Sequence, residues 1–234
     1  MTFSKYPRPV RDIHQIELST RCNLRCKYCP HYPNLPRNKE DMNEETFCAS
    51  LDLIRFYVRQ GTQTELSLTG IGEAMLHPRF VEYATRAREV VGPYRQLTIT
   101  TNGLLLDEQM AAAIAPLRPA VFISLHRPEK AGLAVEVAKK YGVLAGVNAS
   151  FATSAFDWAG AQKNWFVSAP KIPCDYLKSG WAVILVDGRV ATCCLDADGS
   201  SVIGQVTDDP ETLMLKPWSS GKGAGCESCH MSVP

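Results

Sequence analysis

Three cysteines near the amino terminus are close enough in sequence to share one metal site. Cys22, Cys26 and Cys29 form a C-x3-C-x2-C array within the stretch TRCNLRCKYCPH. Thiolates are soft ligands that suit both iron–sulfur clusters and zinc. Three of them fit an iron–sulfur cluster with one open iron, or a zinc site that lacks one ligand. The ligand type alone does not choose between these sites.

A glycine-rich loop offers a second kind of chemistry. The stretch T-G-I-G-E runs from Thr69 to Glu73. Glycines let the backbone approach a ligand closely, and the carboxylate that follows can accept a hydrogen bond from an ammonium group. Taken alone, the stretch is consistent with either a binding loop or an ordinary glycine-rich turn.

More cysteines follow toward the carboxyl terminus, at Cys174, Cys193, Cys194, Cys226 and Cys229. Four thiolates would complete the ligand set of another iron–sulfur cluster, and the same spacings suit a structural zinc ribbon. The last pair lies in C-E-S-C-H, which also spells the attachment motif of c-type haem. Haem attachment usually requires export, and no export signal is visible. We therefore interpret this pair as metal ligands, and His230 as either a surface residue or a residue that contacts the metal ligands.

The composition favours a cytoplasmic protein. The 234 residues include nine cysteines, and the amino terminus MTFSKYPRPVRD is too polar for a signal peptide. An odd cysteine count without a secretion signal favours metal ligation in a reducing compartment, with Cys48 interpreted as a small buried hydrophobe. Basic and acidic residues number 25 and 24, so bulk charge gives no argument for nucleic acid. No run of 18 apolar residues is present to span a membrane.

Strand and helix patterns alternate around these motifs. Alternation of apolar and polar residues predicts five strands, at Ile13–Leu18, Thr64–Thr69, Gln96–Thr101, Ala120–Leu125 and Val143–Ser150. Apolar residues at helical spacing predict four helices, from Asn43 to Gly61, over Pro78–Val91, from Asp107 to Pro116, and over Pro128–Tyr141. Such alternation is typical of parallel strands joined by right-handed crossovers.

We therefore expect an α/β fold, an open partial TIM-type barrel of about five parallel strands and four helices. The cysteine loop and T-G-I-G-E both follow strands, at the end where barrel-type proteins keep their active sites. A hairpin turning at Asp187-Gly188, followed by a short helix over Pro210–Trp218, predicts a small carboxyl-terminal appendage. The expected domains are a core at 1–152, a linker across the barrel mouth at 153–173 and the cysteine-bearing appendage at 174–234.

The first cysteine array resembles the signature loop of the radical S-adenosylmethionine (radical SAM) enzymes. The resemblance implies a [4Fe-4S] cluster on Cys22, Cys26 and Cys29, whose open iron binds the amino and carboxylate groups of S-adenosylmethionine. Tyr28 matches the aromatic residue that these enzymes usually carry before the third cysteine, near the adenine.

The glycine loop resembles the glycine–glycine–glutamate motif of the same superfamily, with Ile71 between the glycines. This resemblance implies that Gly70, Gly72 and Glu73 contact the methionyl amine.

Three polar residues at strand ends match positions of the superfamily with different strength. Ser124 and Asn148 match positions where relatives contact the ribose or the carboxylate, while Asn102 is a weaker match because Asn-Gly is a common turn. Each of the three could equally be a structural polar residue.

The spacing G-x4-C that ends at Cys193 resembles the opening of SPASM and twitch auxiliary-cluster domains. The resemblance implies an auxiliary [4Fe-4S] cluster, with a zinc ribbon as the alternative, on four ligands: Cys174, Cys193, Cys226 and Cys229. Cys194 could replace Cys193, or donate a hydrogen atom as cysteines do in some radical epimerases.

Membership of this superfamily would imply reductive cleavage of S-adenosylmethionine to a 5′-deoxyadenosyl radical that abstracts a substrate hydrogen. In size and cysteine layout the chain is similar to short twitch enzymes such as the aminocyclitol dehydrogenase of butirosin biosynthesis. We therefore expect oxidation or epimerisation of a small polar metabolite of the sugar or cyclitol type. The resemblance also implies an external one-electron donor, such as flavodoxin or ferredoxin.

Two other functions stay open. Modification of a ribosomally made peptide is the first, although the 21 residues before Cys22 leave no room for a leader-binding domain. A non-enzymatic zinc-binding interaction module is the second.

Oxidation of an alcohol needs a base for the hydroxyl proton. Asp157 in the linker is one candidate, and His126 after the fourth strand is another because imidazole titrates near neutrality. Arg127 could orient the substrate or stabilise charge. An exposed, salt-bridging role accounts for each of the three better than catalysis does.

Overall fold

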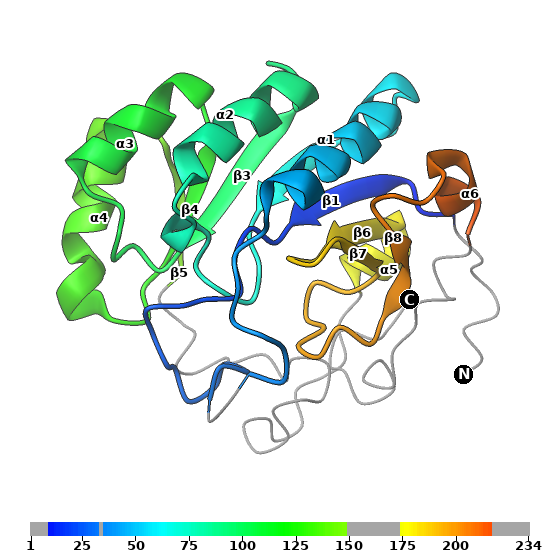
Figure 1. Cartoon of the computed structure of the whole chain (residues 1–234). Coiled ribbons are helices and arrows are strands. Elements are labelled where there is room, and N and C mark those ends of the chain that lie inside the picture. Colours follow the sequence, from blue (N-terminus) through cyan, green and yellow to red (C-terminus); the bar gives the residue numbers. More distant parts are fainter. Residues whose placement is uncertain (1–8, 33–34, 149–173, 217–234) are drawn as a thin grey trace.

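The computed structural model describes residues 9–32, 35–148 and 174–216 of the chain. Over these residues a single eight-stranded sheet has the order β5-β4-β3-β2-β1-β6-β7-β8 (Figure 1). The strands are β1 (Asp12–Ile16), β2 (Glu65–Leu68), β3 (Gln96–Thr101), β4 (Ala120–Ser124), β5 (Leu144–Asn148), β6 (Trp181–Ile184), β7 (Arg189–Ala191) and β8 (Val202–Gln205). The strands β1 to β6 pair in parallel, whereas β7 and β8 pair antiparallel. The edges β5 and β8 do not meet, so the described sheet is open.

Helices connect successive parallel strands and cover one face of the sheet (Figure 1). They are α1 (Glu44–Arg59), α2 (Phe80–Val91), α3 (Glu108–Ile114) and α4 (Pro128–Lys140), with the short 3-10 helices η2 (Ala74–Leu76) and η3 (Ala115–Leu117). Two short helices follow, α5 (Asp175–Ser179) and α6 (Pro210–Leu215). Within the described ranges, no helix combines the length and hydrophobicity needed to cross a bilayer.

Local side-chain chemistry sets where the helices begin. The Asn43 side chain accepts a hydrogen bond from the Thr46 amide at the start of α1. Asp107 does the same for the Met110 amide at the start of α3. Pro128 occupies the first turn of α4, where its missing N–H costs no helical hydrogen bond. These starts agree with the sequence prediction.

The core lies between the helices and the face of the sheet that they cover. Phe47 of α1 stacks on Tyr83 of α2 with the ring centroids 3.7 Å apart. Leu68 of β2 is fully buried in the same core. Side chains alternate along a strand, so the paired residues Ser67 and Thr98 point to the opposite face. That opposite face, polar in its centre, is the interior of the open barrel.

The predicted fold is confirmed, and the structure adds the pairing of one further strand, β6, with β1. All five predicted parallel strands and four helices are present. The hairpin of β6 and β7, expected as an appendage, instead extends the sheet because β6 pairs in parallel with β1. Hydrophobic alternation identifies a strand but carries no information on its neighbour, so sequence could not reveal this pairing. The proposed linker at 153–173 lies outside the described residues, and the domain boundaries stay a prediction.

Candidate active site

The cysteine array occupies the loop that leaves the carboxyl end of β1. The Cys29 amide donates to the Cys26 carbonyl at 3.0 Å, and the Tyr32 amide donates to the Cys29 carbonyl at 2.9 Å. These two consecutive turns keep the second half of the loop compact. The Leu24 amide also donates to the Cys22 sulfur at 3.4 Å. We call residues 20–32 the cysteine loop.

Burial shapes the chemistry of these thiols. It raises the pKa of Cys22, and it raises the pKa of Cys29 to about 12, with the neighbouring thiols adding to both increases. Soft sulfur donors at such a site fit an iron–sulfur cluster, whose positive irons would replace the thiol protons. Among the described residues, no group of three or more Cys, His, Asp or Glu that could hold a metal ion is found. Ligation by these cysteines therefore stays a prediction.

Asn102 reaches the cysteine loop from the carboxyl end of β3. Its side-chain amide donates to the Asn23 side chain at 2.7 Å and lies 3.9 Å from the Cys22 sulfur. Its side-chain oxygen accepts from the Leu104 amide, as expected for an Asn-Gly turn. The Asn-Gly turn, a common turn that made Asn102 a weak match by sequence, is therefore present. The Asn102 side chain nevertheless also contacts the cysteine loop.

Glu73 joins the glycine loop to β3. Its carboxylate is 3% exposed and accepts from the Thr101 hydroxyl at 2.9 Å, the Asn102 amide at 2.7 Å and the Met75 amide at 3.3 Å. Burial raises the pKa of Glu73, and these donors act in the opposite sense. Its backbone amide donates to the Arg21 carbonyl, which ties the glycine loop to the cysteine loop. Contact with the methionyl amine stays a prediction.

Both glycines of this loop are required by packing within the protein. A Cβ atom on Gly70 would lie 2.4 Å from the Cγ atom of Glu17. A Cβ atom on Gly72 would lie 2.4 Å from the Ser19 carbonyl oxygen and 2.5 Å from the Arg21 carbonyl oxygen. Close approach of one loop to another therefore explains the glycines without any ligand.

A buried ion pair that sequence reasoning missed lies beneath these loops. The two terminal guanidinium nitrogens of Arg37 donate to the Glu17 carboxylate, at 2.7 and 2.9 Å, and the side chains are only 7% and 2% exposed. The carboxylate also accepts from the amides of Ile71 and Val186, and Arg37 donates to the Ala197 carbonyl. Glu17 ends an apolar strand, but nothing in the sequence indicated which cation it would meet.

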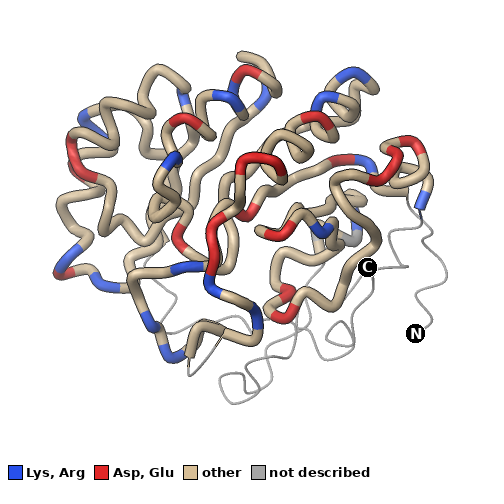
Figure 2. The backbone as a smooth tube through the Cα atoms, in the orientation of Figure 1, with Lys and Arg blue, Asp and Glu red and all other residues tan. Residues whose placement is uncertain are grey.

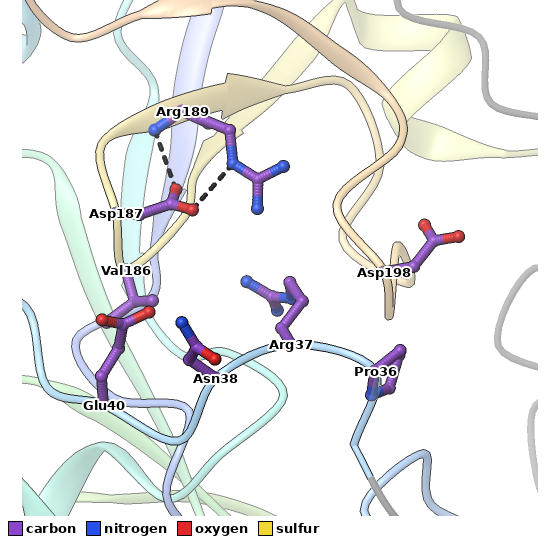
Figure 3. A pocket seen from close by; sticks show the side chains of 8 residues that line it. All are labelled: Pro36, Arg37, Asn38, Glu40, Val186, Asp187, Arg189 and Asp198. Atoms are coloured by element: carbon purple, nitrogen blue, oxygen red, sulfur yellow. Dashed lines mark hydrogen bonds and ion pairs between the residues drawn. The ribbon is translucent and has the colours of Figure 1, made fainter.

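Arg37 also lines a pocket beside this ion pair. The pocket has a volume of about 270 Å³ and lies between the connection before α1 and the turn from β6 to β7. Figure 3 shows Arg37 and Arg189 reaching into it, with Arg189 held by Asp187. The acidic residues Glu40 and Asp198 share the lining. Charges of both signs therefore face the same pocket.

The carboxyl ends of β4 and β5 bring the remaining described candidates together. Ser124 is paired in register with Asn148. His126 follows Ser124, and its Nδ1 atom lies 2.6 Å from the Tyr28 hydroxyl of the cysteine loop. Burial lowers the pKa of His126, which favours a neutral imidazole and makes it a weaker base. Arg127 is exposed and faces Glu129 at 3.5 Å.

Three of the later cysteines lie in the described region. Cys174 and Cys194 pack against the small cluster around Tyr176 and Val183, on the interior face of the sheet, whereas Cys193 accepts from the Leu195 amide at 3.3 Å. Three other predicted residues, Asp157, Cys226 and Cys229, lie outside the described residues, as does His230. The auxiliary ligand set therefore stays a prediction.

Cys48 does not have the environment expected of it. It is half-buried, and its thiol donates to Glu44 at 3.2 Å and accepts from Arg86 at 3.0 Å. Its interpretation as a small buried hydrophobe is wrong, because α1 turns this position toward Glu44 of the same helix and Arg86 of α2 rather than into the core.

Comparison with known families decides the class of the protein. The family model of the Radical SAM superfamily matches residues 16–145. The chain belongs to this superfamily. The match begins at the end of β1 and includes the described candidate residues from Cys22 to Arg127, whereas Asn148 at the end of β5 lies beyond it.

Curated relatives match a little more than half of this radical SAM protein. The GTP 3′,8-cyclase of Aquifex aeolicus is 30% identical over 136 residues, which are 56% of this chain and 40% of that protein. The GTP 3′,8-cyclase of Heliobacterium modesticaldum is 33% identical over 148 residues, covering 61% and 43%. The chain thus spans less than half the length of these relatives.

Solved structures resemble the radical SAM protein over most of its length. BtrN in complex with AdoMet and 2-DOIA has a TM-score of 0.75 at 18% identity, covering 95% of this chain and 91% of that one. Native anSMEcpe with bound AdoMet has a TM-score of 0.63 at 17% identity, covering 93% and 86%. Streptococcus suis SuiB bound to the precursor peptide SuiA has a TM-score of 0.52 at 13% identity, covering 97% and 70%. At these identities the likeness concerns the fold.

Superfamily membership implies S-adenosylmethionine and a [4Fe-4S] cluster as the cofactors of this radical SAM enzyme. Three of its loops, after β1, β2 and β3, meet at the carboxyl end of the sheet, where a cofactor of that size would bind.

Proposed function

We propose that this protein cleaves S-adenosylmethionine reductively and oxidises or epimerises a small polar metabolite of the sugar or cyclitol type. The observation that carries the proposal is the contact of the cysteine loop with two neighbouring strand ends, through Asn102 and Glu73. When bound, the reduced cluster and S-adenosylmethionine supply a 5′-deoxyadenosyl radical that takes a hydrogen atom from the substrate.

Residues of the chain then provide position rather than reactivity, as is usual for enzymes with reactive cofactors. In the proposal, Cys22, Cys26 and Cys29 hold the cluster. Glu73 keeps the glycine loop against β3, where the loop backbone can meet the methionyl amine. Tyr28, steadied by His126, lies beside the adenine.

Oxidation of a substrate alcohol removes two electrons and two protons. One electron and one proton leave together as the abstracted hydrogen atom. The other electron would pass to an auxiliary cluster on Cys174, Cys193, Cys226 and Cys229, and the hydroxyl proton to a nearby base such as Asp157. Epimerisation would instead return a hydrogen atom to the same carbon, so the electron count of the product separates the two reactions.

The first experiment measures metal content and S-adenosylmethionine cleavage after anaerobic reconstitution. We expect about eight irons per chain if both [4Fe-4S] clusters assemble, and 5′-deoxyadenosine on reduction. Zinc without iron, or no 5′-deoxyadenosine from iron-loaded protein, would refute the proposal.

Cys48 offers a matched control for the cysteine loop. The triple variant C22S/C26S/C29S should lose about four irons and all cleavage, because serine does not replace thiolate on iron. Cys48→Ser should keep both, since the Cys48 thiol forms hydrogen bonds with Glu44 and Arg86 on the helical side of the sheet. Equal iron loss in the two variants would show that the effect is not specific to the proposed ligands.

Substrate class is tested by deuterium transfer. Cyclitols and sugars deuterated at their carbinol carbons, and cysteine- or serine-containing peptides as the alternative, are incubated with reduced enzyme. Deuterated 5′-deoxyadenosine from the small molecules alone supports the proposal, whereas label from peptides alone would assign peptide modification.

A further inference from the structure

The cysteine loop has an inner and an outer side. Along its first part, exposure to solvent alternates from residue to residue. Cys22, Leu24, Cys26 and Tyr28 are partly buried, whereas positions 21, 23, 25 and 27 between them are exposed. The side chains predicted to hold the cofactor therefore share a loop with side chains in water, and only the thickness of the loop separates them.

The outer side is basic. Residues 18–39 contain five Lys and Arg residues and no Asp or Glu, in a chain whose totals are 25 and 24. Arg21 pairs with Asp41 and Arg37 with the buried Glu17. The other three cations, Arg25, Lys27 and Lys39, are exposed. Figure 2 shows the basic residues spread along this loop at the lower edge of the molecule.

Several basic residues elsewhere on the described surface form ion pairs. Lys139 and Lys140 of α4 bind Glu136 and Glu108, whereas Arg79 and Arg86 bind Glu44 and Glu82. Lys27 and Lys39 have no such ion pair within 4.0 Å among the described residues, although the exposed Glu40 follows Lys39 in the chain. Exposed cations elsewhere, such as Arg59 and Lys130, also lack an ion pair among the described residues, so the charge count decides. Residues 18–39 hold five basic residues and no acidic one, which leaves 20 basic against 24 acidic residues in the rest of the chain.

The segment that carries Lys39 is tied to the start of the cysteine loop, because Thr20 donates to the carbonyls of Asn38 and Glu40. We propose that the outer side of the loop, with Arg25 and Lys27, forms together with Lys39 the docking surface for an acidic one-electron carrier protein. The inference rests on the proposed function, because the cluster must gain one electron for each cleavage while the carrier loses one, with no bond made or broken between them. Complementary charge raises the rate of encounter and aligns the partners, and it acts most strongly at low ionic strength. Docking here would place the carrier's redox centre one loop away from the cluster.

The test compares two reductants on one enzyme. Flavodoxin hydroquinone serves as the acidic protein donor, and reduced methyl viologen, a small cation, serves as the donor that gains nothing from basic charge. The double variant K27Q/K39Q is compared with Lys139→Gln on α4, whose side chain is exposed and distant in sequence. Iron content is measured for every protein, and 5′-deoxyadenosine formation is followed at about 50 and 200 mM salt.

We expect K27Q/K39Q to lower kcat/KM for flavodoxin about five- to tenfold at low salt and to flatten its salt dependence. Its rate with methyl viologen should stay within about twofold of wild type, and Lys139→Gln should match wild type with both donors. An equal loss with both donors would overturn the inference by placing the lysines in cofactor or substrate binding. Unchanged kinetics with flavodoxin would overturn it too. Failure of wild type to form 5′-deoxyadenosine with methyl viologen would instead overturn the proposed function itself.

Discussion

At the scale of single residues, burial governs the chemistry of the candidate site. Glu73 is almost fully buried, and its pKa is raised by that burial, yet three donors from its own loop and from β3 surround its carboxylate. The thiols of Cys22 and Cys29 also have raised pKa values. Iron binding must therefore release thiol protons, and cluster assembly should become more favourable as pH rises.

His14 on β1 shows the same effect on a base. Its ring stacks on Trp181 with the centroids 3.9 Å apart, and burial lowers its pKa from 6.5 to about 4. At neutral pH the imidazole is uncharged, so its contact with Glu65 at 3.2 Å is a hydrogen bond rather than an ion pair. Protonation of His14 in the folded state would place a positive charge in a buried position, which costs free energy.

We predict that His14 makes the fold sensitive to acid. Between pH 6.5 and about 4 the unfolded chain binds this proton and the folded chain does not. The stabilising contribution is complete above pH 6.5 and is lost as pH falls, by at most about 1.4 kcal/mol per pH unit. His14→Phe keeps an aromatic ring beside Trp181, and should lose less stability than wild type between pH 6.5 and 4.5. Urea midpoints at several pH values check this.

Asp12 supplies a control of opposite sign. Burial raises its pKa from 3.8 to about 6, so between these values the folded chain holds the extra proton and acid stabilises it. Asp12→Asn should therefore lose stability more steeply than wild type as pH falls from 6 to 4. Parallel pH curves for both variants and wild type would contradict the assignment.

At the scale of elements, the glycine loop and the cysteine loop pack closely because glycine, which has no side chain, lies at their contact. Gly72 lies against the backbone of residues 19–21, so one added methyl group must push apart the cysteine loop and the glycine loop. Gly132 on α4 has nothing within 4 Å of its Cβ position and lacks a positive φ.

We predict opposite outcomes for the same substitution at these two glycines. Gly72→Ala should lower the melting temperature and weaken S-adenosylmethionine binding at least tenfold, because three backbone atoms lie within 2.7 Å of the new methyl group. Gly132→Ala should stabilise the protein by about 0.5–1 kcal/mol through its higher helix propensity. Calorimetry of unfolding and of ligand binding measures both. Similar behaviour of the two variants would show that the loops yield easily.

The sequence predicted the elements and the superfamily well, because both depend on local patterns. Period-two and helical patterns located β1 to β5 and α1 to α4, and cysteine spacing identified the superfamily. Long-range partners were beyond its reach. The pairing of β6 with β1, and that of Arg37 with Glu17, depend on where segments far apart in the chain meet. Cys48 was misread for a similar reason, since its environment comes from Arg86 on another helix.

At the scale of the whole molecule, the ion pair of Glu17 and Arg37 connects the parts that carry cysteines. The Glu17 carboxylate lies at the end of β1. It accepts hydrogen bonds from Ile71 of the glycine loop and from Val186 of the segment after β6. Arg37 connects this hydrogen-bond network to the carbonyl of Ala197, a few residues after Cys193 and Cys194.

We predict that breaking this ion pair destabilises the loops at the carboxyl end of the sheet, and with them the fold. Arg37→Met should cost about 3–5 kcal/mol, since it leaves the Glu17 carboxylate buried without a cation. The double variant E17Q/R37M should recover part of that loss because no uncompensated charge is left. Denaturant midpoints of the three proteins measure the coupling. A double variant no more stable than R37M alone would contradict this account.

The central place of β1 has a consequence for biosynthesis. The cysteine loop leaves the ribosome early, but the strand that covers the open side of β1 is made only after β5 and the following segment. Until then the nascent sheet presents β1 as an unpaired edge, and the Glu17 carboxylate lacks its Val186 contact. Exposed strand edges invite pairing with other chains. The cysteine loop is therefore synthesised well before the strand that supports it, and a pause in translation before β6 would leave an aggregation-prone intermediate with its thiols already in place.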